Sequence, residues 1–273
     1  MAYTRPGAVK VNLSLEGGSF RNKTGSHVEA DTFGAGLSLA YKAETSISEF
    51  TYGAFIEAGT GSYNTYNEFI NLGRLLGDGD ARYFGGGLFA HNAFSNGLYL
   101  EGSVRGGSIK NDYKVEETFG ANYDTTNAYW GAHGGLGAKL ALTDAGLLDL
   151  YGKLFWTRTD SDSVSNSARN DRIEFDAVDS LRTRLGGRYT HGYANGTKLY
   201  VGAAWEHEFD GEAGGRVNDI RITNPPSLKG SSAFAEAGVS LAPGENYSID
   251  LGLFGVAGQQ RGLGGTVGLK LEF

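Results

Sequence analysis

The sequence contains no cysteine, one methionine and four prolines among 273 residues. The absence of cysteine excludes disulfides, thiolate catalysis and cysteine-ligated metal sites. Long apolar runs are also missing, since no stretch approaches the roughly 18 residues that a membrane-spanning helix requires. The mean hydropathy is −0.30, which excludes a bundle of transmembrane helices. A spanning β-strand needs only about 9–11 residues, half of which can be polar, so a membrane barrel stays compatible with this composition.

Basic residues are outnumbered by acidic ones. The sequence has 24 Lys and Arg against 31 Asp and Glu, which gives a net charge of −7. A nucleic-acid partner is therefore disfavoured, because there is no basic excess to neutralise phosphates.

Alternation of apolar with polar or small residues is the dominant pattern of the chain. In 262–273, every odd-numbered residue is apolar or glycine and every even-numbered residue is polar or glycine. A period of two places successive side chains on opposite faces of a strand. The fourth predicted strand is the least regular, because Gly85, Gly86 and Gly87 blur its faces. The pattern predicts twelve strands, at 8–20, 31–42, 48–60, 82–94, 97–109, 126–142, 146–158, 179–191, 197–209, 230–241, 247–257 and 262–273.

The connections between these strands alternate in length. Tight turns at the periplasmic end and long loops outside are typical of a membrane barrel. The chain is therefore predicted to be all-β, a single twelve-stranded antiparallel transmembrane β-barrel over 1–273, with a short stub at 1–7 and both termini in the periplasm. Short turns are expected near 44–46, 95–96, 143–145, 194–195 and 243–245, and long polar loops at 61–81, 110–125, 159–178 and 210–229.

Aromatic residues on the apolar faces fall into two groups, one at each end of the predicted strands. Amphipathic rings favour the headgroup level, so two aromatic belts that border an apolar band indicate a bilayer. A soluble all-β protein with one buried face, the alternative, has no reason to sort its aromatics in this way. The belt at the loop end comprises Phe33, Trp130, Trp156 and Trp205, and the belt at the turn end comprises Tyr41, Phe50, Tyr189 and Phe273.

Several segments of the chain resemble autotransporter β-domains. They are LYGKLFWTR at 150–158, FDAVDSLR at 175–182 and YVGAAWEHEFDG at 200–211, and the chain closes on Phe273. The resemblance covers nearly the whole chain and is densest from 146 to 273. It implies a type V secretion translocator, a barrel in a bacterial outer membrane that helps to carry its own N-terminal passenger across, with outer-membrane lipid as its surroundings and no cofactor.

The C-terminal strand carries a further resemblance. Leu269, Leu271 and Phe273 share its lipid-facing side, and the last aromatic residue bears the terminal carboxylate. Such an ending resembles the signal that the outer-membrane barrel assembly machinery reads. The assembly machinery is therefore an expected partner, and these three residues are the expected assembly signal.

The start of the chain departs from the family pattern, in which a helix that threads the pore precedes the first strand. Residues 1–7 precede Ala8, and Pro6 and Gly7 make them a poor helix. Either cleavage of the passenger together with its helix or truncation of the chain would account for this difference. The start also lacks the apolar core of a signal peptide, so we expect the export signal to lie upstream.

Charged residues on the polar faces are expected to point into the lumen. Three arginines form a stripe on one predicted strand, and glutamates lie on the next two, where a guanidinium can match a carboxylate. Such charges hold the barrel's shape and give a passing chain a hydrophilic path. The predicted lumenal residues are Glu57, Glu101, Arg105, Lys153, Arg182, Arg184, Arg188, Glu206, Glu208, Glu236 and Lys270.

No motif indicates an enzyme or a metal site. His207 is flanked by Glu206 and Glu208, but alternation points the imidazole outward and the carboxylates inward, so they do not converge. The other four histidines lack metal-ligand spacing. A translocator without catalytic activity is therefore predicted, with a stand-alone porin-like channel for small solutes as the alternative and an outer-membrane enzyme as a third reading. Self-cleavage of the passenger by lumenal carboxylates stays open, and the asparagine that it uses is not found before residue 8.

Overall fold

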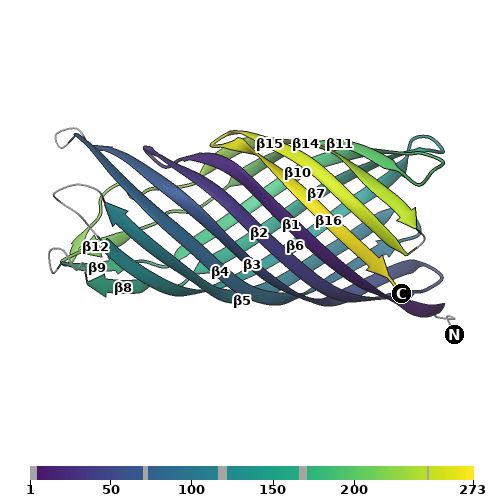
Figure 1. The fold of residues 1–273 in the computed structure, drawn as a ribbon, viewed down its shortest axis with the longest axis horizontal. Helices are drawn as coiled ribbons and strands as arrows, with labels where there is room; N and C mark the ends of the chain where they lie inside the picture. The colour runs from purple at the N-terminus through teal and green to yellow at the C-terminus, as the bar shows by residue number, and fades with distance from the viewer. Residues whose placement is uncertain (1–4, 70–72, 116–121, 166–170, 245) are drawn as a thin grey trace.

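The computed structural model describes residues 5–69, 73–115, 122–165, 171–244 and 246–273. Twelve strands close into one antiparallel barrel in the order β1-β16-β15-β14-β11-β10-β7-β6-β5-β4-β3-β2 (Figure 1). The predicted fold class is confirmed. No helix of the described ranges is long and apolar enough to cross a membrane.

The barrel closes where the first strand meets the last. β1 pairs with β16 continuously, from Lys10 opposite Glu272 to Asn22 opposite Gln260. No strand of the barrel therefore presents an open edge. The barrel strands are β1 (Arg5–Lys23), β2 (His27–Glu44), β3 (Ser48–Phe69), β4 (Gly73–Phe94), β5 (Leu98–Val115), β6 (Asn122–Ala141), β7 (Gly146–Thr159), β10 (Val178–Gly192), β11 (Lys198–Glu208), β14 (Gly230–Gly244), β15 (Tyr247–Gly258) and β16 (Gln260–Glu272).

Tight turns join the strands at one end of the barrel, as the sequence predicts. Two of these turns contain Asn-Gly, and their glycines have positive φ, 88° at Gly97 and 80° at Gly196. Glycine adopts this conformation without the steric cost that a Cβ brings. The Asn96 side-chain oxygen accepts the N–H of Leu98 at 3.0 Å, and Asn195 accepts that of Thr197 at 3.1 Å. The C-terminus lies at this end, which we name the turn end (Figure 1).

The opposite end, the loop end, differs from the prediction. Most of the expected loop at 61–81 is strand, because β3 continues to Phe69 and β4 begins at Gly73. The expected loop at 110–125 is likewise reduced, because β5 continues to Val115 and β6 begins at Asn122. These predictions were wrong because they equated polarity with irregular structure. A strand that extends into water can be polar on both faces and still complete its ladder.

The two other long connections carry a second sheet of four short strands. It has the order β13-β12-β9-β8, formed by β8 (Asp162–Ser165), β9 (Arg172–Phe175), β12 (Gly215–Val217) and β13 (Ile220–Arg221). Labels β8, β9 and β12 lie at the loop end in Figure 1. The prediction of long polar loops at 159–178 and 210–229 was wrong for these strands. Two local pairs, β8 with β9 and β12 with β13, are joined by the pairing of β9 with β12, which are distant in the sequence.

A row of inward-facing aromatic rings connects the barrel wall to this second sheet. Ring centroids are 6.2 Å apart for Tyr63 and Tyr113, 5.2 Å for Tyr113 and Tyr123, and 5.1 Å for Tyr123 and Phe175 of β9. Tyr63 lies beyond the segment expected to cross the bilayer, and burial raises the pKa of its hydroxyl to about 12. The rings therefore fill part of the interior at the loop end.

Further along the barrel, inward aromatic side chains lie over glycines of neighbouring strands. A Cβ at Gly85 would overlap the hydroxyl of Tyr129, and a Cβ at Gly238 would overlap that of Tyr200. Gly85 belongs to the glycine run that made the fourth strand look irregular, yet β4 is continuous. The glycines therefore leave room for aromatic rings against the inner surface of the barrel. The same contact joins Tyr99 to Gly137, Tyr151 to Gly186 and Phe254 to Gly264.

We predict that Gly85→Ala destabilises the barrel by about 1–3 kcal/mol, because the new methyl group overpacks the Tyr129 hydroxyl. The matched control is Gly134→Ala on the outer face of β6, where a Cβ meets nothing within 4 Å. The control should change stability by no more than about 0.5 kcal/mol. Urea unfolding in detergent, followed by loss of the fast-migrating unheated band on a gel, measures both. Equal stabilities would show that the ring-over-glycine contact contributes nothing.

Candidate functional site

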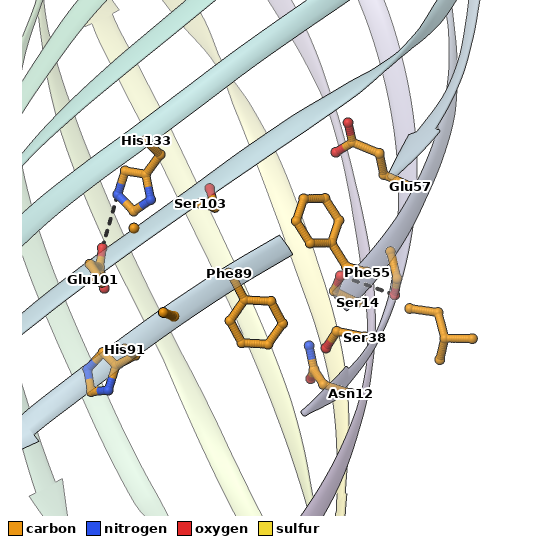
Figure 2. Close-up of a pocket in the computed structure, with 14 residues that line it drawn as sticks. Asn12, Ser14, Ser38, Phe55, Glu57, Phe89, His91, Glu101, Ser103 and His133 are labelled. Atoms are coloured by element: carbon orange, nitrogen blue, oxygen red, sulfur yellow. Dashed lines mark hydrogen bonds and ion pairs between the residues drawn. The ribbon is translucent and has the colours of Figure 1, made fainter. Parts of the chain in front are cut away.

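Cavities inside the barrel are bordered by side chains from several walls. One cavity of about 680 Å³ touches Glu57, Arg105 and Arg188, which belong to β3, β5 and β10. A second of about 390 Å³ is bordered by Glu101 and His133, with other inward side chains around it (Figure 2). Several of the predicted lumenal charges therefore gather around open space inside the barrel.

Arg188 and Glu236 form the most complete ion pair of the interior. Arg188 Nε donates to Glu236 Oε1 at 2.8 Å and Nη2 donates to Oε2 at 2.7 Å. The two residues lie on β10 and β14 with β11 between them, so the contact spans a strand across the concave inner face. The guanidinium also lies over the ring of Tyr200, 4.6 Å from its centroid. Two parallel bonds from a planar guanidinium fix both partners in orientation.

The other two arginines of the predicted stripe have different surroundings. Arg184 Nε donates to Glu206 Oε1 at 2.6 Å, and Glu206 is only 5 % exposed. Arg182 lies over the ring of Phe155 at 5.6 Å and forms no ion pair within the described ranges. Glu208, directly opposite Arg182, instead accepts the Ser180 hydroxyl at 2.7 Å. The stripe therefore consists of two arginines that are paired with carboxylates and one, Arg182, for which the described residues show no ion pair.

A second group of charges lies on β3, β5 and β7, and β7 pairs directly with β10. Arg105 Nη1 lies 3.3 Å from Glu57 Oε2, and Lys153 Nζ lies 2.6 Å from Glu101 Oε1. Lys270, on β16, lies 3.0 Å from Asp250 Oδ2. Each of these three cations is paired with a carboxylate on the neighbouring strand or on the next strand but one. The interior is thus polar but locally balanced in charge.

Three participants were missed from the sequence. Tyr129 donates to Glu57 Oε1 at 2.6 Å, His133 Nε2 lies 3.1 Å from Glu101 Oε1 (Figure 2), and Asp250 neutralises Lys270. Alternation already places Tyr129 and His133 on the face opposite Trp130, so the register contains the signal. The prediction omitted them because it considered mainly residues that are charged at neutral pH, and it passed over Asp250 on the inner face of β15.

The predicted belt residues lie on the outer faces of their strands. At the loop end, Trp156 Nε1 donates to Asp179 at 3.2 Å, and Asp179 also pairs with Arg158 at 2.7 Å. At the turn end, Tyr52 contacts the rings of both Tyr41 and Phe50. Tyr189 is half-buried. The other belt residues, Phe33, Trp130, Trp156, Trp205, Tyr41, Phe50 and Phe273, are exposed.

His207 faces outward, as alternation predicts, and does not meet the neighbouring carboxylates. Its ring lies between those of Trp205 and Phe209, with centroids 5.6 and 4.6 Å away, and its Nδ1 is 2.8 Å from Ser231 Oγ. Glu206 pairs with Arg184 on the inner face. The histidine and the acid therefore lie on opposite sides of the wall and cannot exchange a proton directly.

The chain matches the family model described as the autotransporter beta-domain over residues 11–253. Among solved structures it is similar to the β-domain of the Bordetella autotransporter BrkA, at 18% identity and TM-score 0.75, with 97% of this chain and 100% of that chain covered. It is also similar to the transport unit of the autotransporter AIDA-I from Escherichia coli, at 16% identity and TM-score 0.72, covering 98% and 91%. The translocator domain of NalP from Neisseria meningitidis shares 17% identity at TM-score 0.67, covering 97% and 88%. No match was found among curated proteins.

Replacing Arg182, Arg184 and Arg188 by Ser should make the barrel more cation-selective in planar bilayers. The change frees the carboxylates of Glu206 and Glu236 from their guanidinium partners, and free carboxylates attract cations. The measurement is the reversal potential under a salt gradient. Arg158→Ser is the control, because it removes one positive charge from the outer face and should leave selectivity unchanged. An unaltered reversal potential in a conducting triple variant would show that these side chains do not border the ion path.

Proposed function

The chain belongs to the autotransporter β-domain family and is an outer-membrane translocator barrel, and from this premise we propose that it helps to export an N-terminal passenger across the outer membrane. The observation that carries the proposal is the inner face. Most of the predicted lumenal charges are neutralised in place, as in the Arg188–Glu236 and Arg184–Glu206 pairs. A polypeptide that moves past such a wall meets polar groups for hydration and few unpaired charges that would hold it.

We propose that the turn end lies in the periplasm and the loop end outside the cell. The start of β1 and the end of β16 both lie at the turn end, so both termini are then periplasmic. A passenger joined upstream of β1 would begin its passage on the side from which exported chains arrive. Short turns on the periplasmic side and larger connections outside are the usual arrangement of outer-membrane barrels.

We propose that Leu269, Leu271 and Phe273 are the signal through which the assembly machinery recognises the chain. Phe273 is 73 % exposed, and its backbone exchanges two hydrogen bonds with Val9, at 2.9 and 3.1 Å. Before the barrel closes, these groups of Phe273 and the groups of β16 that face β1 are unpaired. An unpaired edge strand can be recognised by strand addition, with alternate side chains supplying specificity.

We further propose that the barrel acts without catalytic chemistry of its own. His207 and its acidic neighbours lie on opposite faces of the wall, and the predicted lumenal glutamates are engaged by cations or hydroxyl groups. The channel for small solutes is the second candidate, because charged side chains border open cavities in the interior. Surface display separates the two candidates.

We expect a reporter segment fused upstream of residue 1, and exported to the periplasm, to reach the cell surface. Protease added to intact cells should then release it, because the barrel provides the route across the outer membrane. The same reporter exported without the barrel is the control and should stay protected. Release only after the outer membrane is permeabilised, together with uptake of small sugars through the barrel, would instead support the channel.

Deletion of Phe273 should lower assembly in cells far more than it lowers stability in detergent. Loss of one partly exposed ring costs about 1–3 kcal/mol at most, and loss of the two backbone hydrogen bonds with Val9 costs about 0.5–1.5 kcal/mol each. A closed barrel survives losses of this size. Phe33→Ala is the matched control, because Phe33 is a 52 % exposed outer ring that lies away from the terminus. The control should lose similar stability but keep normal display. Normal display by the deletion variant would show that Phe273 is only one more belt residue.

A further inference from the structure

Two arginines face each other on the outer surface of the closing seam. Arg21 of β1 lies directly opposite Arg261 of β16, near the loop end. Like charges in directly opposed positions destabilise a sheet unless an anion neutralises them. Glu29 is 3.7 Å from Arg21, whereas the exposed Arg261 has no ion pair within the described ranges. The seam therefore carries a positive charge that the described chain does not neutralise.

The neighbouring imidazole of His27 does not add to this positive charge. Burial lowers the pKa of His27, and the guanidinium groups of Arg21 and Arg261 lower it further, against the opposing effect of Glu29. His27 is therefore neutral at neutral pH. Its Nδ1 lies 3.0 Å from Arg21 Nη2, which holds that guanidinium in place.

A polar hollow of about 500 Å³ opens beside the two arginines. Arg21, Arg261 and Ser19 border it on the β1 and β16 side, and Glu29 and Asp31 border it on the β2 side. An anionic group in this hollow is attracted to the arginine side and repelled by the acidic side. The hollow thus orients an anion toward the seam.

An apolar groove of about 670 Å³ continues from this hollow toward the middle of the outer face. Its floor consists of small residues on β11, β14 and β15, and Trp205 and Leu185 form its walls. Gly262 and Leu263 border both the groove and the polar hollow, so the two are continuous. Exposed leucines and aromatic rings lie on many other strands of the outer face. The small residues of the floor are Ala203, Ala233, Ala235, Gly255 and Ala257.

We propose that the groove and the hollow form one binding site for a phosphorylated, multiply acylated glycolipid of the outer leaflet. Its phosphate binds Arg21 and Arg261 through charge-assisted hydrogen bonds. Its acyl chains lie on the alanine and glycine floor, where the absence of large side chains lets methylene groups approach the backbone. The proposal rests on the proposed orientation, because the loop end must lie in the outer leaflet.

The test uses the fluorescence of Trp205, which borders the groove. Trp130→Phe and Trp156→Phe leave it as the sole tryptophan of the refolded protein in detergent. Titration with lipid A should change its emission saturably, with an affinity at least tenfold higher than that of dephosphorylated lipid A. Arg21→Ser with Arg261→Ser should abolish this tenfold preference, and both lipids should then bind equally weakly.

The control variant is Arg82→Ser with Lys110→Ser. These residues also face each other on the outer surface near the loop end, but Asp112 lies 3.4 Å from Lys110. The control should keep the full preference for the phosphorylated lipid. Equal affinity of the starting protein for the two lipids, or an equal loss in the control variant, would overturn the site. Heat-dependent gel mobility verifies that each variant is folded. Failure of reporter display with lipid binding intact would overturn the translocator function alone.

Discussion

Closure of the backbone ladder is the constraint on which the rest of the structure depends. Hydrocarbon offers no hydrogen-bonding partner, so a sheet can cross a bilayer only when its first and last strands pair. The β1–β16 seam meets this requirement with continuous pairing from Lys10 to Asn22. Closure also creates the concave inner face. Ion pairs that span a strand, such as Arg188 with Glu236, are geometrically accessible only there.

The interior follows from this curvature. Inward rings such as Tyr129 and Tyr200 occupy space that would collide with a side chain on a nearby strand, and glycine supplies that space. Paired charges occupy part of the remaining inner surface, where Arg105, Arg184 and Arg188 each have a carboxylate close by. The result is a wall that is fixed in shape and polar toward the lumen. Rigidity and hydration are thus obtained from the same set of side chains.

The barrel strands and their turn-end connections follow from the sequence, because a period of two and Asn-Gly turns are local signals. The alternation also predicts the inner or outer face of residues such as Glu206 and His207. It does not predict which charges pair, because Arg188 reaches across β11 to Glu236 through curvature that no local pattern encodes. The second sheet was missed for a related reason. Its strand β9 pairs with β12, a partner some 40 residues away that is specified by packing at the loop end.

The second sheet affects the insertion of the barrel into its membrane. In the proposed orientation, its charged residues, among them Arg172, Glu174 and Arg221, must cross the hydrocarbon once during insertion. A charged side chain at the midplane costs up to about 2–4 kcal/mol, and several cross together. Unassisted insertion is therefore slow, and withdrawal faces the same barrier. Once inserted, the barrel is held in one orientation kinetically, whatever the free-energy difference between its two orientations.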